Sequence, residues 1–247
     1  LKKKLKDLIM LKITNLNRKI KIYADGPELK EINKKIIFNL DGYTFNPSLF
    51  RKLGVKDYLY FCKQIIKKCS NKPISFEVFG DDEETMYRQA LILSSLSKNV
   101  YVKIPISYTN GNTTKNLIKK LAKKKIKLNI TAIFTLKQVQ NILPVVKNSN
   151  CILSIFAGRI YDCGFDALKE MKVINNYIKK YSNCKSLWAS CRMPYDIISA
   201  IEAKTDIITM GIPMIKKIEN FKLTREKYSL LTVKQFFLDA KKSKYKL

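Results

Sequence analysis

The feature that most constrains the fold of this sequence is a regular alternation of short β-branched segments with longer amphipathic segments. Short apolar runs rich in β-branched residues are typical of buried strands, and apolar residues three or four positions apart are typical of helices. Strands are predicted over 21–25, 42–44, 74–78, 100–104, 127–132, 151–155, 186–189 and 206–209. Helices are predicted over 28–36, 48–69, 83–97, 114–125, 136–147, 165–181, 194–204 and 214–220, and a last one, capped by Ser229, over 229–241.

Eight strand–helix units in a chain of 247 residues predict an α/β fold, a single-domain (β/α)8 TIM barrel. A doubly wound sheet is the alternative, but it would favour a glycine-rich turn after the first strand. Here that turn reads Ala24-Asp25-Gly26-Pro27. The barrel with its C-terminal helix is assigned to residues 21–247, and residues 1–20 are assigned to a short basic N-terminal lead.

The net charge is +28, because 48 lysines and arginines face only 20 acidic residues. Such a charge suggests nucleic acid, an anionic membrane surface or small anionic ligands as partners. Only six of the cations are arginines, the residues that nucleic-acid surfaces usually employ, and no basic motif interleaved with stacking aromatics occurs. We therefore expect no nucleic-acid partner, and a basic nucleic-acid-binding protein remains the non-enzyme alternative.

The chain has no histidine, and its six cysteines show no CxxC pairing. Zinc sites of cysteine and histidine, and catalysis by Ser-His or Cys-His pairs, are therefore not expected, and no metal site is predicted. Scattered thiols fit a reducing compartment. No apolar run approaches the roughly 18 residues of a membrane span and no signal peptide is visible, so we expect a cytoplasmic protein without membrane contact.

Polar residues stand at the end of one predicted strand after another, where a barrel carries its catalytic face. For a single serine such as Ser75, a strand end that faces water is the simpler interpretation. The repetition over seven strands instead indicates an active site. These strand-end residues are Asp25, Thr44, Asn46, Ser75, Glu77, Lys103, Asn129, Thr131, Ser154, Ser190 and Arg192.

Lys103 is the most informative of these residues, because it lies between Val102 and Ile104 and is followed by a proline. A lysine among apolar neighbours is costly to bury unless it is neutral or paired. Desolvation favours the neutral amine, which is the nucleophile of Schiff-base chemistry with a carbonyl substrate. Asp25 and Glu77 are the candidate groups for proton transfer.

Two arginines follow neighbouring late strands in this lysine-dominated chain: Arg159 after the sixth and Arg192 after the seventh. The loops after late barrel strands commonly hold a phosphate, which a guanidinium group can grip with two hydrogen bonds. A surface salt bridge is the usual role of one arginine. The pair together favours an anion site, and a carbonyl-bearing sugar phosphate would satisfy both Lys103 and the arginines.

Seven segments of the chain resemble the transaldolase family of class I aldolases, in the family's order from about residue 20 to the C-terminus. Three of them are the most specific in combination: Asn46-Pro47, Lys103-Ile104-Pro105 and Gly158-Arg159. The other similar stretches are Tyr23-Ala24-Asp25-Gly26, Ser75-Phe76-Glu77-Val78, Leu128-Asn129-Ile130-Thr131 and Ala189-Ser190-Cys191-Arg192.

The resemblance implies a transferase that moves a dihydroxyacetone unit from a ketose phosphate to an aldose phosphate, as in the pentose phosphate pathway, with no external cofactor. It implies that Lys103 forms the Schiff base, that Asp25 acts as acid and base, and that Glu77 and Thr131 hold a proton-relaying water. Thr44, Asn46, Asn129, Ser154 and Phe156 would line the substrate site, and Arg159, Ser190 and Arg192 would grip the phosphate. The implied partners are small sugar phosphates and, because relatives form dimers or larger rings, further copies of the chain.

A related group, the fructose 6-phosphate aldolases, tends to carry glutamine where Glu77 stands and tyrosine where Phe156 stands, so both positions favour a transaldolase. Phe45 departs from the family, which usually has a second threonine there, and beside substrate hydroxyls it would alter donor selectivity. An aldolase that releases dihydroxyacetone, or a specialised sugar-phosphate aldolase or transaldolase, is the alternative function. The last helix could pack on its own barrel or on a neighbour's.

Overall fold

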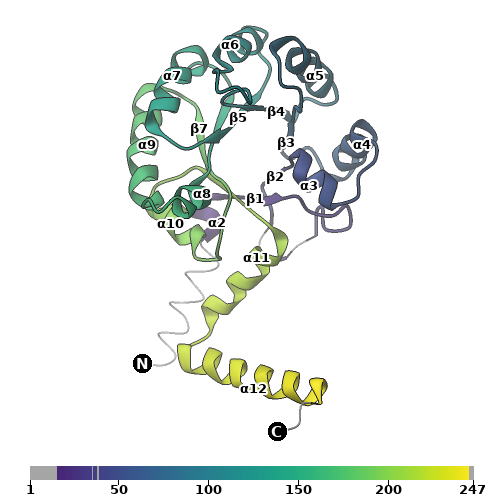
Figure 1. Ribbon diagram of the computed structural model, residues 1–247, viewed down its shortest axis with the longest axis vertical. Coiled ribbons are helices and arrows are strands. Elements are labelled where there is room, and N and C mark those ends of the chain that lie inside the picture. The colour runs from purple at the N-terminus through teal and green to yellow at the C-terminus, as the bar shows by residue number, and fades with distance from the viewer. Residues whose placement is uncertain (1–15, 35, 38, 245–247) are drawn as a thin grey trace.

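Eight parallel strands close into a barrel in the computed structural model, which describes residues 16–34, 36–37 and 39–244. The strands follow one another around the barrel in chain order, and β1 pairs with β8 to close it (Figure 1). Their bounds are β1 Lys21–Asp25, β2 Gly42–Thr44, β3 Ile74–Glu77, β4 Val100–Pro105, β5 Leu128–Ile133, β6 Cys151–Ile155, β7 Lys185–Trp188 and β8 Ile207–Met210. The predicted single-domain (β/α)8 barrel is therefore confirmed.

Helices between the strands form the outer ring of the barrel in Figure 1. Several begin at a side chain that accepts a hydrogen bond from the first helical turn, as Asp57, Asp82 and Thr135 do. In chain order, the α-helices before the last one are α2 Leu16–Lys19, α3 Pro47–Lys52, α4 Tyr58–Lys68, α5 Glu83–Ser95, α6 Lys115–Lys123, α7 Leu136–Val146, α8 Ala157–Asp162, α9 Ala167–Tyr181, α10 Asp196–Glu202 and α11 Ile212–Lys217. The 3-10 helix η1, Ile218–Lys222, follows α11.

Three helix predictions differ from the structure, and one observed helix was not predicted. The predicted helix 28–36 is wrong, because residues 29–33 form turns with Asn33 at a positive φ of 61°. The predicted helix 48–69 is two helices, since Gly54 adopts a φ of 68° and Asp57 caps a new start. The six-residue α8 was not predicted, and the last helix, α12 Arg225–Ser243, begins earlier than expected because Thr224 rather than Ser229 caps it.

The buried apolar side chains form two clusters: a large one, to which strands and helices both contribute, and a smaller one of Tyr23, Ile152, Leu187, Ala189 and Ile207 on the strands and the residue after β7. Leu16 and Ile20 are buried in the large cluster, so the last residues of the predicted N-terminal lead pack against the barrel. The rest of that lead, residues 1–15, lies outside the described residues.

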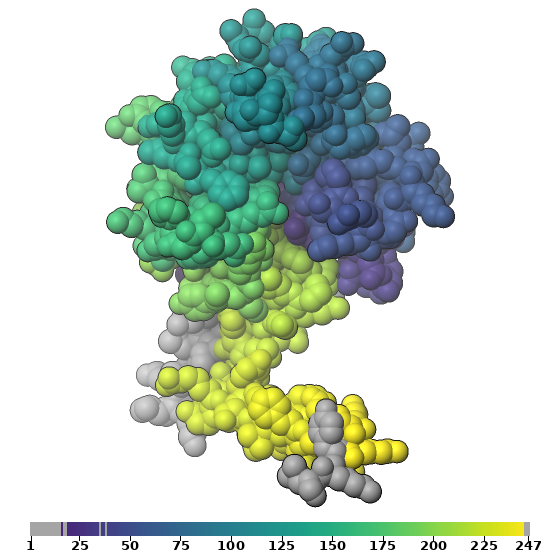
Figure 2. Space-filling model, in the orientation of Figure 1, coloured from purple at the N-terminus to yellow at the C-terminus, as the bar shows by residue number. Residues whose placement is uncertain are grey.

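The last helix, α12, stands away from the barrel in Figures 1 and 2. None of its side chains from Arg225 to Ser243 is buried. Within the described residues, no helix has the length and apolar character that a membrane crossing requires.

Candidate active site

The carboxyl ends of the strands surround a cavity of about 250 Å³. Ten of the twelve predicted site residues line it: Asp25, Thr44, Asn46, Lys103, Thr131, Ser154, Phe156, Arg159, Ser190 and Arg192. The other two, Glu77 and Asn129, lie behind this lining and contact residues of it. Because these side chains come from β1 to β7 and the loops that follow them, the barrel itself assembles the site.

Lys103 is 5% exposed and forms an ion pair with Glu77, whose Oε2 lies 3.0 Å from the lysine Nζ. The two residues are in register on β4 and β3, so their side chains leave neighbouring strands at the same level. Nζ also lies 3.3 Å from the backbone carbonyl oxygen of Phe45, to which it can donate. A buried lysine must be either neutral or paired, and in the structure Lys103 is paired. The carboxylate of Glu77 can also accept its proton.

Asp25 faces the same cavity from the end of β1 and accepts a hydrogen bond of 2.6 Å from the hydroxyl of Thr44. Burial raises the pKa of this carboxyl, while the nearby charge of Lys103 and the hydrogen bond from Thr44 oppose the shift. The Thr44 hydroxyl lies 2.6 Å from that of Thr209 on β8. A chain of two hydroxyls therefore fixes the orientation of the Asp25 carboxyl group.

Asn129 supports the floor of the site. Its amide Nδ2 donates to Ser75 over 2.9 Å, and its Oδ1 accepts from Ser154 over 2.6 Å. Since both ends of the amide are engaged and Asn129 is fully buried, it orients Ser154, which does line the cavity.

Thr131 is directed into the cavity by an irregularity of β5. The register between β5 and β6 shifts between Ile130 and Ile133, and Ala132 adopts a positive φ of 59°. The Thr131 hydroxyl is buried and has no hydrogen-bond partner among the described residues. A buried hydroxyl of this kind is suited to hold a water or a substrate oxygen.

The two predicted arginines both line the cavity, and the loops after β6 and β7 that carry them are in contact. The amide of Gly158 donates to the carbonyl of Ala189 over 3.4 Å. A Cβ at position 158 would lie only 1.7 Å from the carbonyl oxygen of Ser190, so only glycine allows this approach. Ser190 itself adopts a positive φ of 62°, and Arg159 lies over the ring of Phe156, 5.1 Å from its centroid.

Arg192 is held from two sides. Its backbone amide donates to the buried carboxylate of Asp196 over 2.6 Å, and its guanidinium forms an ion pair with Asp162 of α8. The hydrogen bond to Arg192 lowers the pKa of Asp162 and raises that of Arg192. Burial raises the pKa of Asp196, although the backbone N–H groups of Met193 and Arg192 oppose this.

The residues at the site that sequence reasoning missed include Thr209, Asp162, Asp196 and Lys52. Thr209 ends a predicted strand and could have been found, but the other three lie on helices without a strand-end signal. The expectation that Phe45 stands beside substrate hydroxyls is wrong: its side chain is fully buried and stacks on Phe76, outside the cavity. Among residues 16–34, 36–37 and 39–244, no group of three or more cysteines or carboxylates could hold a metal ion.

Comparisons with known proteins bear on the family and on the fold of this chain. The family model described as "Transaldolase/Fructose-6-phosphate aldolase" matches residues 22–247. A "Probable transaldolase" of Bdellovibrio bacteriovorus is 33% identical over 83% of this chain and 92% of its own length, and one of a Sulfurihydrogenibium species is 33% identical over 81% and 88%. A solved thiamine phosphate pyrophosphorylase from Pyrococcus furiosus covers 84% of this chain and 98% of its own with a TM-score of 0.53, and at 9% identity it shows the fold alone.

Proposed function

Because this chain is an enzyme of the transaldolase/fructose-6-phosphate aldolase family, we propose that it transfers a dihydroxyacetone unit from a ketose phosphate to an aldose phosphate through a Schiff base on Lys103. The observation that carries this proposal is the ion pair of buried Lys103 with partly buried Glu77, 3.0 Å apart, at a cavity that two arginines also line. The pentose phosphate pathway uses this type of reaction.

Schiff-base formation begins when Glu77 takes a proton from the Lys103 ammonium, which frees the amine to attack the ketone carbon. The carbinolamine then loses its hydroxyl as water and becomes a protonated imine. The Thr131 hydroxyl has no hydrogen-bond partner within the described part of the chain, and a water held between it and Glu77 would carry the protons of both steps.

Cleavage of the carbon–carbon bond requires a base at the hydroxyl next to the bond that breaks. Asp25 accepts that proton, the bond electrons move into the imine to give an enamine on Lys103, and an aldehyde is released. The reverse steps with a second aldose phosphate return the proton from Asp25 and, after hydrolysis, free the lysine. The raised pKa of Asp25 suits a group that must both take and give a proton.

Substrate binding falls to the residues that line the cavity. Arg159, Ser190 and Arg192 would bind the phosphate, since guanidinium groups and hydroxyls are its preferred donors. Thr44, Asn46, Ser154 and Phe156 would contact the donor sugar. Asn129 would act through Ser154, to which it is hydrogen-bonded.

A fructose 6-phosphate aldolase, or an aldolase or transaldolase for a specialised sugar phosphate, is the alternative within the family. The carboxylate of Glu77 and the phenyl ring of Phe156 favour a transaldolase by the resemblance described above. Turnover of fructose 6-phosphate that depends on an aldose phosphate acceptor supports transfer, whereas release of free dihydroxyacetone without acceptor supports the aldolase. We also place the reaction in the cytoplasm, because the six free cysteines fit a reducing compartment.

The proposal is tested by trapping. Incubation with fructose 6-phosphate and borohydride should reduce the imine and leave a dihydroxyacetone adduct, which intact mass and peptide mapping will locate on Lys103. Most of the other lysines within the described residues are exposed, and they serve as internal controls in the same peptide map. Folded protein that gives no adduct with any ketose phosphate would sink the proposed chemistry.

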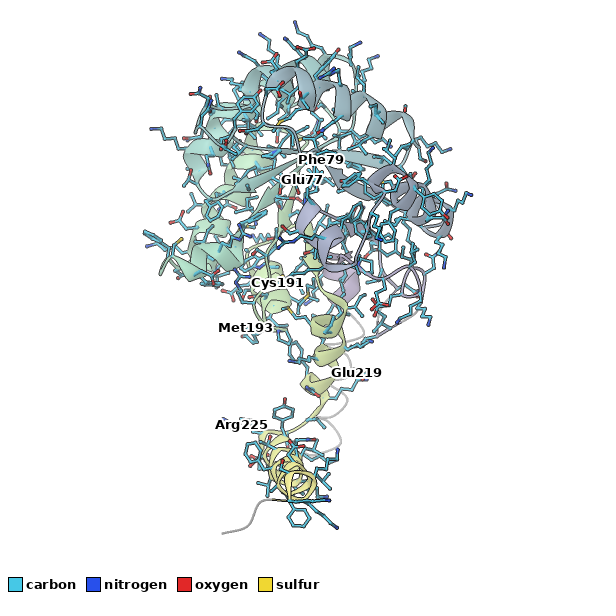
Figure 3. All side chains as sticks on the ribbon, turned by 45° about the vertical axis from the view of Figure 1, so that its right-hand side comes forward. Glu77, Phe79, Cys191, Met193, Glu219 and Arg225 are labelled. Atoms are coloured by element: carbon cyan, nitrogen blue, oxygen red, sulfur yellow. The ribbon has the colours of Figure 1, made fainter. Side chains whose placement is uncertain are left out.

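We further propose that the protein self-associates and that α12 packs on a second copy. Seven large apolar residues of this helix are about half exposed or more: Tyr228, Leu230, Leu231, Val233, Phe236, Phe237 and Leu238. Exposed large apolar side chains that gather on one helix mark an interaction site. Figure 3 shows Arg225, the first residue of α12, separated from the barrel by the segment that carries Glu219.

An apolar hollow of about 90 Å³ between α4 and α5 offers a complementary surface. Tyr58, Leu59, Phe79 and Ile92 line it, and the last three are exposed. Acidic residues, which are few elsewhere in this chain, lie close in sequence to its lining residues: Asp57, Asp81, Asp82, Glu83 and Glu84, of which Glu83 already pairs with Lys120. Since α12 carries five cations and two anions, its charge fits these acidic residues, and a second copy supplies both surfaces.

We expect the Phe236→Asp/Phe237→Asp variant to lower the molecular mass that light scattering measures in solution to that of a single chain, because both rings are 67% exposed or more on α12. Ile92→Asp in the hollow should act in the same direction. Gln235→Ala, a polar change on the same helix, should keep the mass of the wild-type assembly. A wild-type protein that is monomeric at micromolar concentration would contradict this part of the proposal.

A further inference from the structure

The guanidinium of Arg192 is engaged along one of its edges by Asp162, which ends α8 one turn after Arg159. Nε of Arg192 lies 3.0 Å from Oδ1 and 3.1 Å from Oδ2 of Asp162, and Nη2 also donates to Oδ2. These two nitrogens form the side-on edge of the guanidinium. The carboxylate therefore holds the plane of the group as well as its charge.

Some N–H groups of the Arg192 guanidinium are not used by Asp162 and are available to a ligand. A guanidinium has five N–H groups, and Asp162 takes the one on Nε and one of the two on Nη2. The second N–H of Nη2 and both N–H groups of Nη1 remain, and the end-on edge is formed by that N–H of Nη2 together with one N–H of Nη1. Because Arg192 lines the cavity, this edge is the one available to an anion there.

We propose that Asp162 is a positioning residue that holds Arg192 so that its end-on edge grips the substrate phosphate with two hydrogen bonds. This inference rests on the proposed function, in which Arg192 belongs to the phosphate site. Asp162 acts through Arg192 and does not touch the reacting atoms.

The contacts of Arg192 favour Asp162 as the residue that orients its guanidinium group. The side chains of Arg192 and Asp162 are 42% and 51% exposed, so the pair contributes little to stability but can restrict the motion of a long side chain. Asp196 fixes only the backbone of Arg192, through the amides of Arg192 and Met193. The glycine contact between Gly158 and Ser190 fixes the distance between α8 and the loop that carries Arg192.

Two effects of removing the Asp162 carboxylate oppose each other. Loss of a negative charge near the site favours anion binding, but solvent screens a charge that is half exposed. Loss of the anchor frees Arg192 to leave the orientation that a phosphate needs, and a misplaced binding group can cost a factor of about 100. We therefore expect the loss of orientation to dominate.

The test measures phosphate-bearing and phosphate-free substrates side by side. Asp162→Ala should raise the KM for fructose 6-phosphate about tenfold and leave kcat within about twofold. Borohydride trapping of dihydroxyacetone, which has no phosphate, should proceed at the wild-type rate. Asp162→Asn should raise the same KM less, because it keeps one acceptor, and Asp162→Glu should restore part of the affinity.

The matched control is Glu202→Ala, which removes another exposed ion pair, with Lys172, that does not line the cavity. Its KM for fructose 6-phosphate should equal that of the wild type. A lower KM in Asp162→Ala would show that Asp162 competes with the phosphate, and an equal loss with both substrates would show a general structural role. Either result overturns the inference. Wild-type trapping with dihydroxyacetone tests the proposed function separately, since it needs no phosphate site.

Discussion

We expect the Lys103→Met variant to lose the transfer reaction by about 10⁴-fold or more, as is typical when the group that forms the covalent intermediate is removed. Lys103 lines the cavity, is 5% exposed and has the carboxylate of Glu77 as a proton acceptor 3.0 Å away. Turnover of fructose 6-phosphate with an aldose phosphate acceptor, followed in a coupled assay, measures the loss. The borohydride adduct should disappear in the same variant.

A folding defect must be separated from a chemical one, because removal of Lys103 leaves the partly buried carboxylate of Glu77 without its partner. Lys103→Arg keeps a positive charge beside Glu77 but provides no amine for a Schiff base, so it should be as inactive as Lys103→Met. Lys21→Met, an exposed lysine at the opposite end of the barrel, should retain full turnover. Activity in Lys103→Arg within about tenfold of wild type would contradict a Schiff base at this residue.

The strands of this fold and the ring of polar residues at their ends are readable from the sequence, because both depend on local patterns. Short apolar runs predict strands, and parallel strands bring their carboxyl ends to one face of a barrel. The same alternation explains the error at Phe45. Since Thr44 and Asn46 face the cavity, the residue between them faces the opposite side and joins the core.

The helices were less predictable because caps and turns, rather than periodicity, determine where they begin and end. Asp57 and Thr224 begin α4 and α12 through single hydrogen bonds to backbone amides. The helix α8 has six residues, which is too short for a periodic pattern, yet it carries both Arg159 and Asp162. The pairing of Asp162 with Arg192 joins residues 30 positions apart and depends on the folded loops.

The pairing of polar side chains in the site was also not predictable from the sequence. The sequence identified Lys103 as a residue that must be neutral or paired, but the choice of Glu77 as its partner follows from the register of β3 and β4. Thr209 reaches Thr44 only because β8 closes the barrel against β1. Long-range contacts of this kind arise from barrel closure and leave no local signal.

We expect the Asp25→Asn variant to lower the rate of carbon–carbon bond cleavage by about 10² to 10⁴-fold, the usual contribution of a positioned acid or base. The amide has the shape of the carboxyl group and can still accept the hydrogen bond from Thr44. Because Lys103 and Glu77 remain, the Schiff base should still form, and borohydride should trap the uncleaved ketose phosphate on Lys103. This combination of a retained adduct and lost turnover distinguishes Asp25 from Lys103.

The pH dependence gives a second readout. Burial raises the pKa of Asp25, so the carboxylate that acts as base is lost at a higher pH than for an ordinary aspartate with a pKa of about 3.9. As the pH falls through the raised pKa, kcat of the wild type should fall. Asp25→Asn should lack this acidic limb.

The raised pKa of Asp25 also predicts how this carboxyl group affects the stability of the fold as the pH changes. A carboxyl whose pKa is higher in the folded than in the unfolded protein stabilises the fold below its unfolded pKa, and this contribution is lost as the pH rises through the folded value. At neutral pH the buried carboxylate of Asp25 therefore costs free energy of folding. The melting temperature of Asp25→Asn should equal or exceed that of the wild type, in keeping with strain retained at a functional site.

Asp206→Asn is the matched control, because Asp206 is a carboxyl at the opposite end of the barrel that accepts hydrogen bonds from the backbone amide and hydroxyl of Ser186. It should retain turnover within about twofold of wild type. Asp25→Asn with wild-type kcat, or with neither adduct nor turnover in folded protein, would show that Asp25 does not act as the acid–base group of cleavage. Trapping and turnover measured on the same preparation decide between these outcomes, since only a defect confined to cleavage leaves the uncleaved ketose on Lys103.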